Sequence, residues 1–186
     1  MATTLPRYVA FLRGVSPQNL SMPVLKACLE RCGFSDVRTL LSSGNATFAA
    51  RGSTRETALE RKIEAALKDD VGREFMTFVR SVDDLNELLA SDPHAGFPPV
   101  PSAKRVVTFL RHAGAAAPRA ELPLERDGAR VLCVRGSEVF SDYLPSPRGP
   151  VFMTLLQKTF GDAITTRTWE TVRKCAASPP AKPPRR

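Results

Sequence analysis

The sequence predicts an α+β fold made of two similar units, and three observations lead to this prediction. Strand-like and amphipathic-helix patterns alternate over residues 7–80 in the order strand, helix, strand, strand, helix, strand. A proline-rich stretch at 93–101 then interrupts the pattern. Beyond it, residues 106–112 (VVTFLRH) resemble residues 8–14 (YVAFLRG), which indicates an internal duplication with antiparallel sheets.

Each element of the first unit follows from hydrophobic periodicity and from the residue that stops it. An apolar run between charged ends predicts a central strand that is buried on both faces. Apolar residues at helical spacing predict two amphipathic helices, which end at Gly33 and Gly72. The predicted elements are strand 7–13, helix 25–32, strand 36–41, strand 45–49, helix 54–71 and strand 74–80. This β-α-β-β-α-β order is the ferredoxin-like motif, with both helices on one face of the sheet.

The second unit is less regular. Ser81 is expected to cap a connecting helix, and the proline-rich stretch follows. Strand-like segments flank Gly136 as others flank Gly44, which aligns the two glycines. Residues 113–128 are rich in Ala, Pro and charge, so the first helix of this unit is expected to be short or lost. The remaining predicted elements are helix 151–160, a short edge strand 163–166, and a last helix capped by Thr168.

These elements divide the chain into four parts. The predicted limits are 1–92 for the first ferredoxin-like unit with its connecting helix, 93–101 for the connection, 102–177 for the second unit with its C-terminal helix, and 178–186 for a disordered tail.

The composition is that of an ordinary globular chain, with 42% hydrophobic and 25% charged residues. No apolar run is long enough to span a bilayer, and the N-terminal run at 9–12 is too short for a signal peptide. We therefore expect a cytoplasmic protein without membrane association. The net charge is +8, but Lys182, Arg185 and Arg186 lie in the tail, so the charge alone does not predict nucleic-acid binding.

The motifs that usually announce catalysis or cofactor binding do not occur in this sequence. It contains no phosphate-binding loop, dinucleotide fingerprint, nucleophile elbow or zinc-protease motif. The four cysteines have no metal-type spacing, and Cys28 and Cys32 are expected to be reduced core thiols. Only two histidines are present, His94 and His112, which makes a histidine-based site hard to assemble. We therefore predict no metal, no cofactor and no catalytic residue.

One candidate site follows from the predicted sheet. The first strand of a ferredoxin-like sheet is antiparallel to the third, so the end of one lies beside the start of the other. The residues expected to meet there are Arg13, Gly14, Ser42, Ser43, Gly44 and Asn45. Their hydroxyl, amide and guanidinium groups suit a carboxylate or phosphate. A Gly-Asn pair with serines also suits a tight hairpin turn, so a binding site and a purely structural turn both stay open.

Two further residues are candidates near the start of the last helix. Arg167 precedes this helix, whose amide end favours an anion as the guanidinium does. Trp169 is the only tryptophan, and it suits either packing of the helix on the sheet or stacking against a ligand.

Three motifs together resemble a known bacterial family: LRG at 12–14, SSGN at 42–45 and TTRTW at 165–169. The chain is similar, over about residues 7–177, to the domain-of-unknown-function family numbered 1697. The resemblance implies two ferredoxin-like units and no established activity. The motif residues that it carries over are Arg13, Gly14, Ser43, Gly44, Asn45, Arg167 and Trp169.

Two segments depart from the family's pattern. Ser16-Pro17-Gln18-Asn19 stands where the family usually has Asn-Val-Gly-Gly, and a common Ser-Lys-Leu is replaced around residues 146–149. If those segments hold a ligand in relatives, this chain binds it differently or not at all.

Three functions are compatible with these observations. The first is a non-enzymatic protein that binds an anionic small molecule at the Arg13/SSGN edge of the sheet. The second is a nucleic-acid binder of weak sequence specificity that uses arginine-rich faces and the basic tail. The third is an enzyme acting on a phosphorylated or acidic metabolite, with Asp36 or Asp142 as the base, although no carboxylate pair is apparent. Catalysis is therefore uncertain and not favoured, and the oligomeric state is left unknown.

Overall fold

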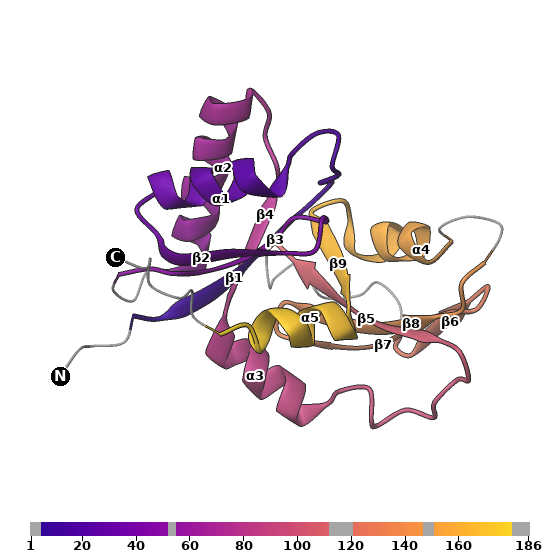
Figure 1. The fold of residues 1–186 in the computed structure, drawn as a ribbon. Helices are drawn as coiled ribbons and strands as arrows, with labels where there is room; N and C mark the ends of the chain where they lie inside the picture. Colours follow the sequence, from indigo (N-terminus) through magenta and orange to yellow (C-terminus); the bar gives the residue numbers. More distant parts are fainter. Residues whose placement is uncertain (1–4, 52–54, 112–120, 147–150, 180–186) are drawn as a thin grey trace. The chain divides into compact units, whose positions relative to one another are not determined.

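The computed structural model describes residues 5–51, 55–111, 121–146 and 151–179 (Figure 1). Within these ranges the chain forms nine strands and five helices, and the strands make two antiparallel sheets. The fold class is therefore α+β, as the sequence predicts. No helix in the described ranges is both long and apolar enough to cross a membrane.

The chain divides into two compact units. Unit 1 contains Met1–Glu87 and Lys174–Arg186, and unit 2 contains Leu88–Arg173. The sequence predicts the break at 93–101, but the chain divides earlier, within helix α3 (Val82–Ser91). The stretch 93–101 belongs to unit 2 because it packs there: the carbonyl oxygen of Pro98, for example, accepts a hydrogen bond of 3.0 Å from Arg130.

Unit 1 contains a four-stranded sheet in the order β2-β3-β1-β4, in which every neighbouring pair is antiparallel. Its elements are β1 (Arg7–Leu12), α1 (Met22–Arg31), β2 (Ser35–Leu40), β3 (Asn45–Ala49), α2 (Glu56–Val71) and β4 (Thr77–Ser81). Strand β1 is buried on both faces, as predicted. Helices α1 and α2 contribute Leu25, Leu29 and Ile63 to one core with Ala10 and Phe48, so both helices cover the same face of the sheet (Figure 1).

Helix α2 also seals the outer edge of β4. Its residues Glu56, Glu60 and Glu64 recur every four positions, so they lie in one stripe about 6 Å apart along the helix. The outward-facing amides of an antiparallel edge strand recur every second residue, or about every 6.7 Å. Because the two spacings match, each carboxylate accepts a hydrogen bond from one backbone N–H: the bonds join Glu56 to Ser81 (2.8 Å), Glu60 to Val79 (3.0 Å) and Glu64 to Thr77 (2.8 Å).

The C-terminal segment is part of unit 1. The sequence predicts disorder from residue 178, but Ser178 is buried, and its carbonyl oxygen accepts a hydrogen bond of 2.7 Å from the Arg7 guanidinium. The rest of the predicted tail, from residue 180, lies outside the described residues.

Unit 2 contains a five-stranded antiparallel sheet in the order β6-β7-β8-β5-β9. Its elements are β5 (Lys104–Leu110), β6 (Leu124–Arg126), β7 (Ala129–Arg135), β8 (Glu138–Tyr143), α4 (Val151–Phe160), β9 (Ile164–Thr168) and α5 (Trp169–Ala176), the last of which crosses the unit boundary. Strand β9 is an edge strand, as predicted, and the Thr168 hydroxyl caps α5 by accepting a bond of 3.2 Å from the Thr171 amide. Strand β6 was not predicted. The part of 113–128 before residue 121, where a short or missing helix was predicted, lies outside the described residues.

Candidate functional site

The turn between β2 and β3 is built around Asn45. This residue is fully buried, and its amide nitrogen donates hydrogen bonds to the Leu40 carbonyl oxygen (3.1 Å) and to the Ser43 hydroxyl (3.0 Å). Gly44 has a φ of +75°, and a Cβ added there would lie 2.7 Å from Cγ2 of Val15. Gly44 and Asn45 therefore have a structural role that the turn alone explains.

The register of the sheet brings Arg13 to this turn, as the sequence predicts. The backbone amide of Leu12 donates to the Gly44 carbonyl oxygen at 2.8 Å, and the Arg13 amide donates to the Met76 carbonyl oxygen at 2.8 Å. The main chain at Arg13 is thereby held from both sides. Its side chain is half-buried, and among the described residues its guanidinium makes no hydrogen bond or ion pair. Ser42 is exposed on the same turn.

The loop after Arg13 is held together by hydrogen bonds of the Asn19 side chain. Gly14 is exposed with a φ of +71°, and its carbonyl oxygen accepts a hydrogen bond of 2.8 Å from the Asn19 side chain. The same side chain accepts a bond of 2.9 Å from the Ser16 amide. Asn19 thus closes the segment that departs from the family's glycine-containing pattern.

Arg167 and Trp169 belong to unit 2, and each has contacts within that unit. The Arg167 guanidinium donates to the Thr165 hydroxyl and to the Thr166 carbonyl oxygen, both at 2.9 Å. Trp169 is half-buried, and its ring lies edge-on to the His94 ring with 5.0 Å between the ring centroids. Packing therefore accounts for the position of this tryptophan.

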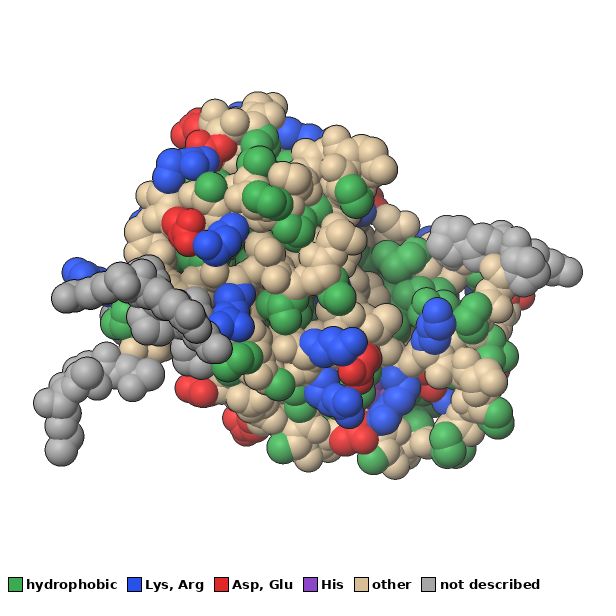
Figure 2. All heavy atoms as spheres, in the orientation of Figure 1, with side chains coloured by type: hydrophobic (Ala, Val, Ile, Leu, Met, Phe, Trp, Pro, Cys, Tyr) green, Lys and Arg blue, Asp and Glu red, His purple; other side chains and the backbone are tan. Residues whose placement is uncertain are grey.

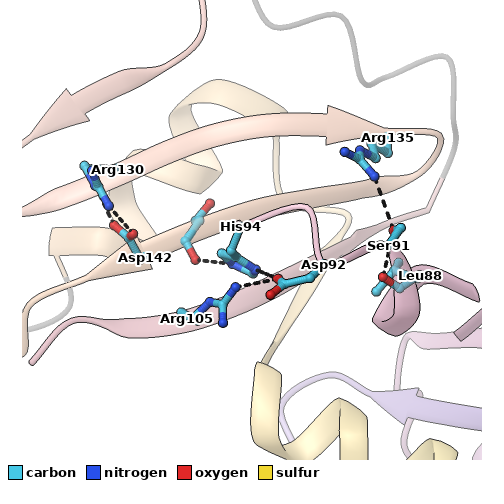
Figure 3. A network of polar contacts seen from close by, with 9 residues as sticks. Leu88, Ser91, Asp92, His94, Arg105, Arg130, Arg135 and Asp142 are labelled. Carbon is cyan, nitrogen blue, oxygen red and sulfur yellow. Dashed lines mark hydrogen bonds and ion pairs between the residues drawn. The ribbon is translucent and has the colours of Figure 1, made fainter. Parts of the chain in front are cut away.

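A polar network lies in unit 2 around His94 (Figure 3). On one side of it, Arg105 is hydrogen-bonded to the Asp92 carboxylate, and this bond holds the pKa of Asp92 below its usual range. On the other side, Arg130 binds both carboxylate oxygens of Asp142, with Nε donating to Oδ1 at 2.8 Å. Both oxygens of Asp142 are thus held by a cation.

The two carboxylates named as candidate bases are poorly placed for that role. Asp142 is 6% exposed and engaged by Arg130. Asp36 is exposed on β2, where it has a φ of 51°. Neither residue is paired with a second carboxylate or a histidine in the contacts of the described residues, so the structure brings no acid–base pair together at these positions.

The His94 ring is fixed in one orientation. Its Nε2 lies 3.1 Å from the carbonyl oxygen of Ser141, and a carbonyl only accepts, so Nε2 carries the proton. The ring packs edge-on against Phe140 and Trp169. Burial lowers the pKa of His94, and the charge of Arg105 lowers it further, against the opposing effects of Asp92 and of the backbone of Ser141 and Val106. The ring is therefore neutral at pH 7, with Nδ1 as its hydrogen-bond acceptor.

A cavity of about 320 Å³ adjoins this ring, lined by Asp92, His94, Phe97, Arg105 and Asp142 among others. Sequence reasoning named His94 and Asp142 but missed Asp92, Arg105 and Arg130. Arg130 and Asp142 are directly opposite on β7 and β8 only because the register shifts between Val131 and Cys133, so the sequence carries no signal for this pair. A second cavity, of about 380 Å³, is lined by the start of α4, by the end of β9 including Arg167, and by the segment 143–146.

The two antiparallel sheets and five helices of the described residues define an α+β protein. The chain belongs to the family described as "Protein of unknown function (DUF1697)", whose model matches residues 5–140. The LRG and SSGN motifs lie inside this span, and the TTRTW motif lies beyond it. No curated protein matches the chain.

A solved structure supports the same fold. The chain is similar to conserved bacterial protein SP0830 from Streptococcus pneumoniae, with a TM-score of 0.69 and 19% sequence identity. The similarity covers 93% of this chain and 98% of that one.

Proposed function

We propose that this protein binds an anionic small molecule at the Arg13 turn site, which consists of Arg13, Gly14 and Ser42–Asn45. The observation that carries the proposal is the state of Arg13. Its backbone amide is held by Met76 and the preceding amide of Leu12 by Gly44, while its guanidinium makes no hydrogen bond or ion pair with any described residue. A guanidinium on a fixed main chain offers a planar fork of donors that matches a carboxylate or phosphate.

The neighbouring groups divide into those that shape the site and those that can bind. The amide of Asn45 is occupied by Leu40 and Ser43, and Gly44 allows the close approach to Val15, so both shape the turn. The Ser42 hydroxyl is exposed beside them and is a second donor for an anion. Arg13 and Ser42 are therefore the residues that we expect to contact the ligand.

The experiment is a thermal-shift screen followed by calorimetric titration, at moderate salt, with inorganic phosphate, citrate and adenosine monophosphate. Binding is expected in the wild-type chain, about tenfold weaker in Arg13→Lys, which keeps the charge but loses the fork, and absent in Arg13→Ala. Arg61→Ala is the matched control, because Arg61 is exposed on α2 and its loss changes the net charge equally. The proposal fails if none of the three anions binds, or if Arg61→Ala weakens binding as much as Arg13→Ala.

Nucleic-acid binding has less support. On the surface shown in Figure 2, Lys and Arg side chains lie beside Asp and Glu side chains at several places. The basic residues of the tail lie outside the described residues. A fluorescence titration with a single-stranded oligonucleotide at two salt concentrations separates the two functions, because nucleic-acid binding falls steeply with salt.

We also infer that the two units are duplicated ferredoxin-like units. The strand order β2-β3-β1-β4 has its counterpart in β7-β8-β5-β9, with α2 and α4 at equivalent points along the chain. The bond from Leu12 to Gly44 corresponds to the bond of 2.8 Å from Leu110 to Ser137. This register matches Gly44 with Ser137, so the glycine alignment expected from sequence is displaced by one residue.

The edge arginines add independent support for the duplication. Arg80 on β4 donates to the preceding carbonyl oxygen of Val79 at 2.7 Å, and Arg167 on β9 does the same to Thr166 at 2.9 Å. An alignment of family sequences tests the inference: it predicts residue similarity between the halves at these register-matched positions, and similarity no greater than that of unrelated strands would contradict it.

A further inference from the structure

We infer that the cavity beside His94 is a second binding site, which takes a small molecule through an N–H hydrogen-bond donor, an amine or an amide. This site is independent of the Arg13 turn site, and either proposal can fail without the other. It rests on one unsatisfied atom, on the groups that fix that atom in place, and on the cavity that His94 lines.

The unsatisfied atom is Nδ1 of His94. The residue is only 5% exposed, and Nδ1 has no hydrogen-bond partner among the residues that the structure describes. A buried acceptor without a donor is costly, commonly on the scale of a lost hydrogen bond, so native proteins rarely leave one. The other ring nitrogen cannot take over this role, because it is engaged with the Ser141 carbonyl oxygen.

The surroundings hold the acceptor rigidly. The Ser141 bond and the edge-on contacts with Phe140 and Trp169 leave the ring one orientation. Arg105 is hydrogen-bonded to Asp92, and the Arg105 guanidinium lies 5.5 Å from the centre of the Trp169 ring. A donor that reaches Nδ1 therefore meets a preorganised partner, and little side-chain ordering opposes binding.

The chemistry of the cavity favours a donor rather than an anion. Oδ1 of Asp92 lies 3.8 Å from Nδ1, and both residues line the cavity, so a carboxylate and a neutral imidazole lie side by side as acceptors there. The two guanidiniums nearest the cavity are occupied, Arg105 by Asp92 and Arg130 by Asp142. An N–H group can satisfy Nδ1 with Asp92 beside it, whereas an anion would be placed against both acceptors. The volume of about 320 Å³ fits a small organic molecule.

A metal ion is not the occupant that these residues suggest. No group of three or more His, Cys, Asp or Glu side chains comes together among the residues that the structure describes. His94 and Asp92 supply only two such ligands at the cavity, fewer than a stable metal site uses.

The test follows the ring nitrogens of His94 by NMR. The chain has two histidines, so a His112→Gln background with labelled histidine leaves one imidazole to observe. Ethylammonium and acetamide are titrated as the charged and the neutral N–H donor. Tetramethylammonium, a cation without an N–H group, is the control. We expect a saturable shift of the Nδ1 signal with at least one donor and none with the control, and the stronger donor shows whether the natural ligand class is an amine or an amide.

Two variants make the result specific. In His94→Gln the side-chain amide can keep the bond to Ser141 while the acceptor at Nδ1 is lost, so the thermal shift caused by the donor should disappear. In Asp92→Asn the donor should bind about tenfold more weakly. The inference is overturned if neither donor moves Nδ1, if tetramethylammonium moves it equally, or if a folded His94→Gln protein responds like wild type. If His94→Gln does not fold, the NMR titration of the His112→Gln protein with the two donors and tetramethylammonium is sufficient to support or overturn the inference.

Discussion

The carboxylate of Glu60 accepts a hydrogen bond of 3.0 Å from the backbone amide of Val79, at a position where Glu60 is only 3% exposed. The same carboxylate lies 3.8 Å from the Arg80 guanidinium. Glu60→Ala leaves a buried amide and a nearby arginine without this acceptor, so we expect the free energy of unfolding to fall by about 2–4 kcal/mol. Urea denaturation followed by circular dichroism measures the change.

The control for this prediction is Glu30→Ala. Glu30 forms an exposed ion pair with Lys26, whose loss should cost less than about 1 kcal/mol. An equal loss in the two variants would show that the Glu60 contact contributes no more than a surface ion pair.

Gly44 and Gly14 form a matched pair for testing how much the turn depends on close packing. Both have φ near +70°, but a Cβ at Gly44 meets Val15 at 2.7 Å, and a Cβ at Gly14 meets nothing within 4 Å. Gly14→Ala should cost about 1 kcal/mol, the penalty of the left-handed backbone alone. Gly44→Ala should cost about 2–4 kcal/mol because steric overlap is added. Thermal unfolding of both variants measures this difference, and equal melting temperatures would contradict it.

The stability of unit 2 should fall in mild acid because of His94. Burial lowers the folded-state pKa of this histidine below its ordinary value of about 6.5, so the unfolded chain binds the proton more readily. The contribution to stability is complete above pH 6.5 and is lost as the pH falls from there through the lowered pKa. Asp92 and Arg105 are the charged groups that face the ring, and they act in opposite directions.

Urea unfolding at several pH values between 5 and 8 checks this expectation. The His94→Gln variant should lack the component of the pH dependence that arises in this window. If wild type and His94→Gln have parallel pH profiles, the histidine is not the responsible group.

The thiol of Cys28 should resist alkylation in the folded protein. Burial, with a hydrogen bond to Asp70 as the next cause, raises its pKa to about 12, so only about one thiol in ten thousand is ionised at pH 8. Cys32 is also buried, and its pKa is raised for the same main reason. Cys133 is only half-buried and should react first. Mass spectrometry after a short exposure to iodoacetamide, with and without urea, shows the order, and early labelling of Cys28 would contradict it.

Local signals in the sequence were sufficient for most elements of the fold. Strand β3 (Asn45–Ala49) and helix α4 (Val151–Phe160) have the predicted bounds, because each is limited by a turn residue and has a clear hydrophobic period. The hydroxyl of Ser81 accepts a bond of 3.0 Å from the Asp84 amide, as the capping pattern predicted. Strand β4 begins at Thr77 rather than at residue 74, because its ladder with β1 starts at the Leu12–Thr77 pair.

The cavity beside His94 could not be predicted in the same way. Counting outward from the Gly136 turn pairs Arg130 with Tyr143, but an irregularity between Val131 and Cys133 shifts the register and pairs Arg130 with Asp142. Nothing in the sequence marks this bulge. His94 itself reaches Ser141, which is distant in the chain, and periodicity contains no information about such contacts.

The bond from Arg7 to Ser178 has a consequence for synthesis of the protein on the ribosome. Unit 1 combines β1 with residues from 174 onward, so all of unit 2 is translated before unit 1 is complete. Arg7 on β1 can therefore form its bond to Ser178 only after the intervening chain has been synthesised. Unit 2, by contrast, is one continuous stretch of chain, so its folding needs no residue outside Leu88–Arg173.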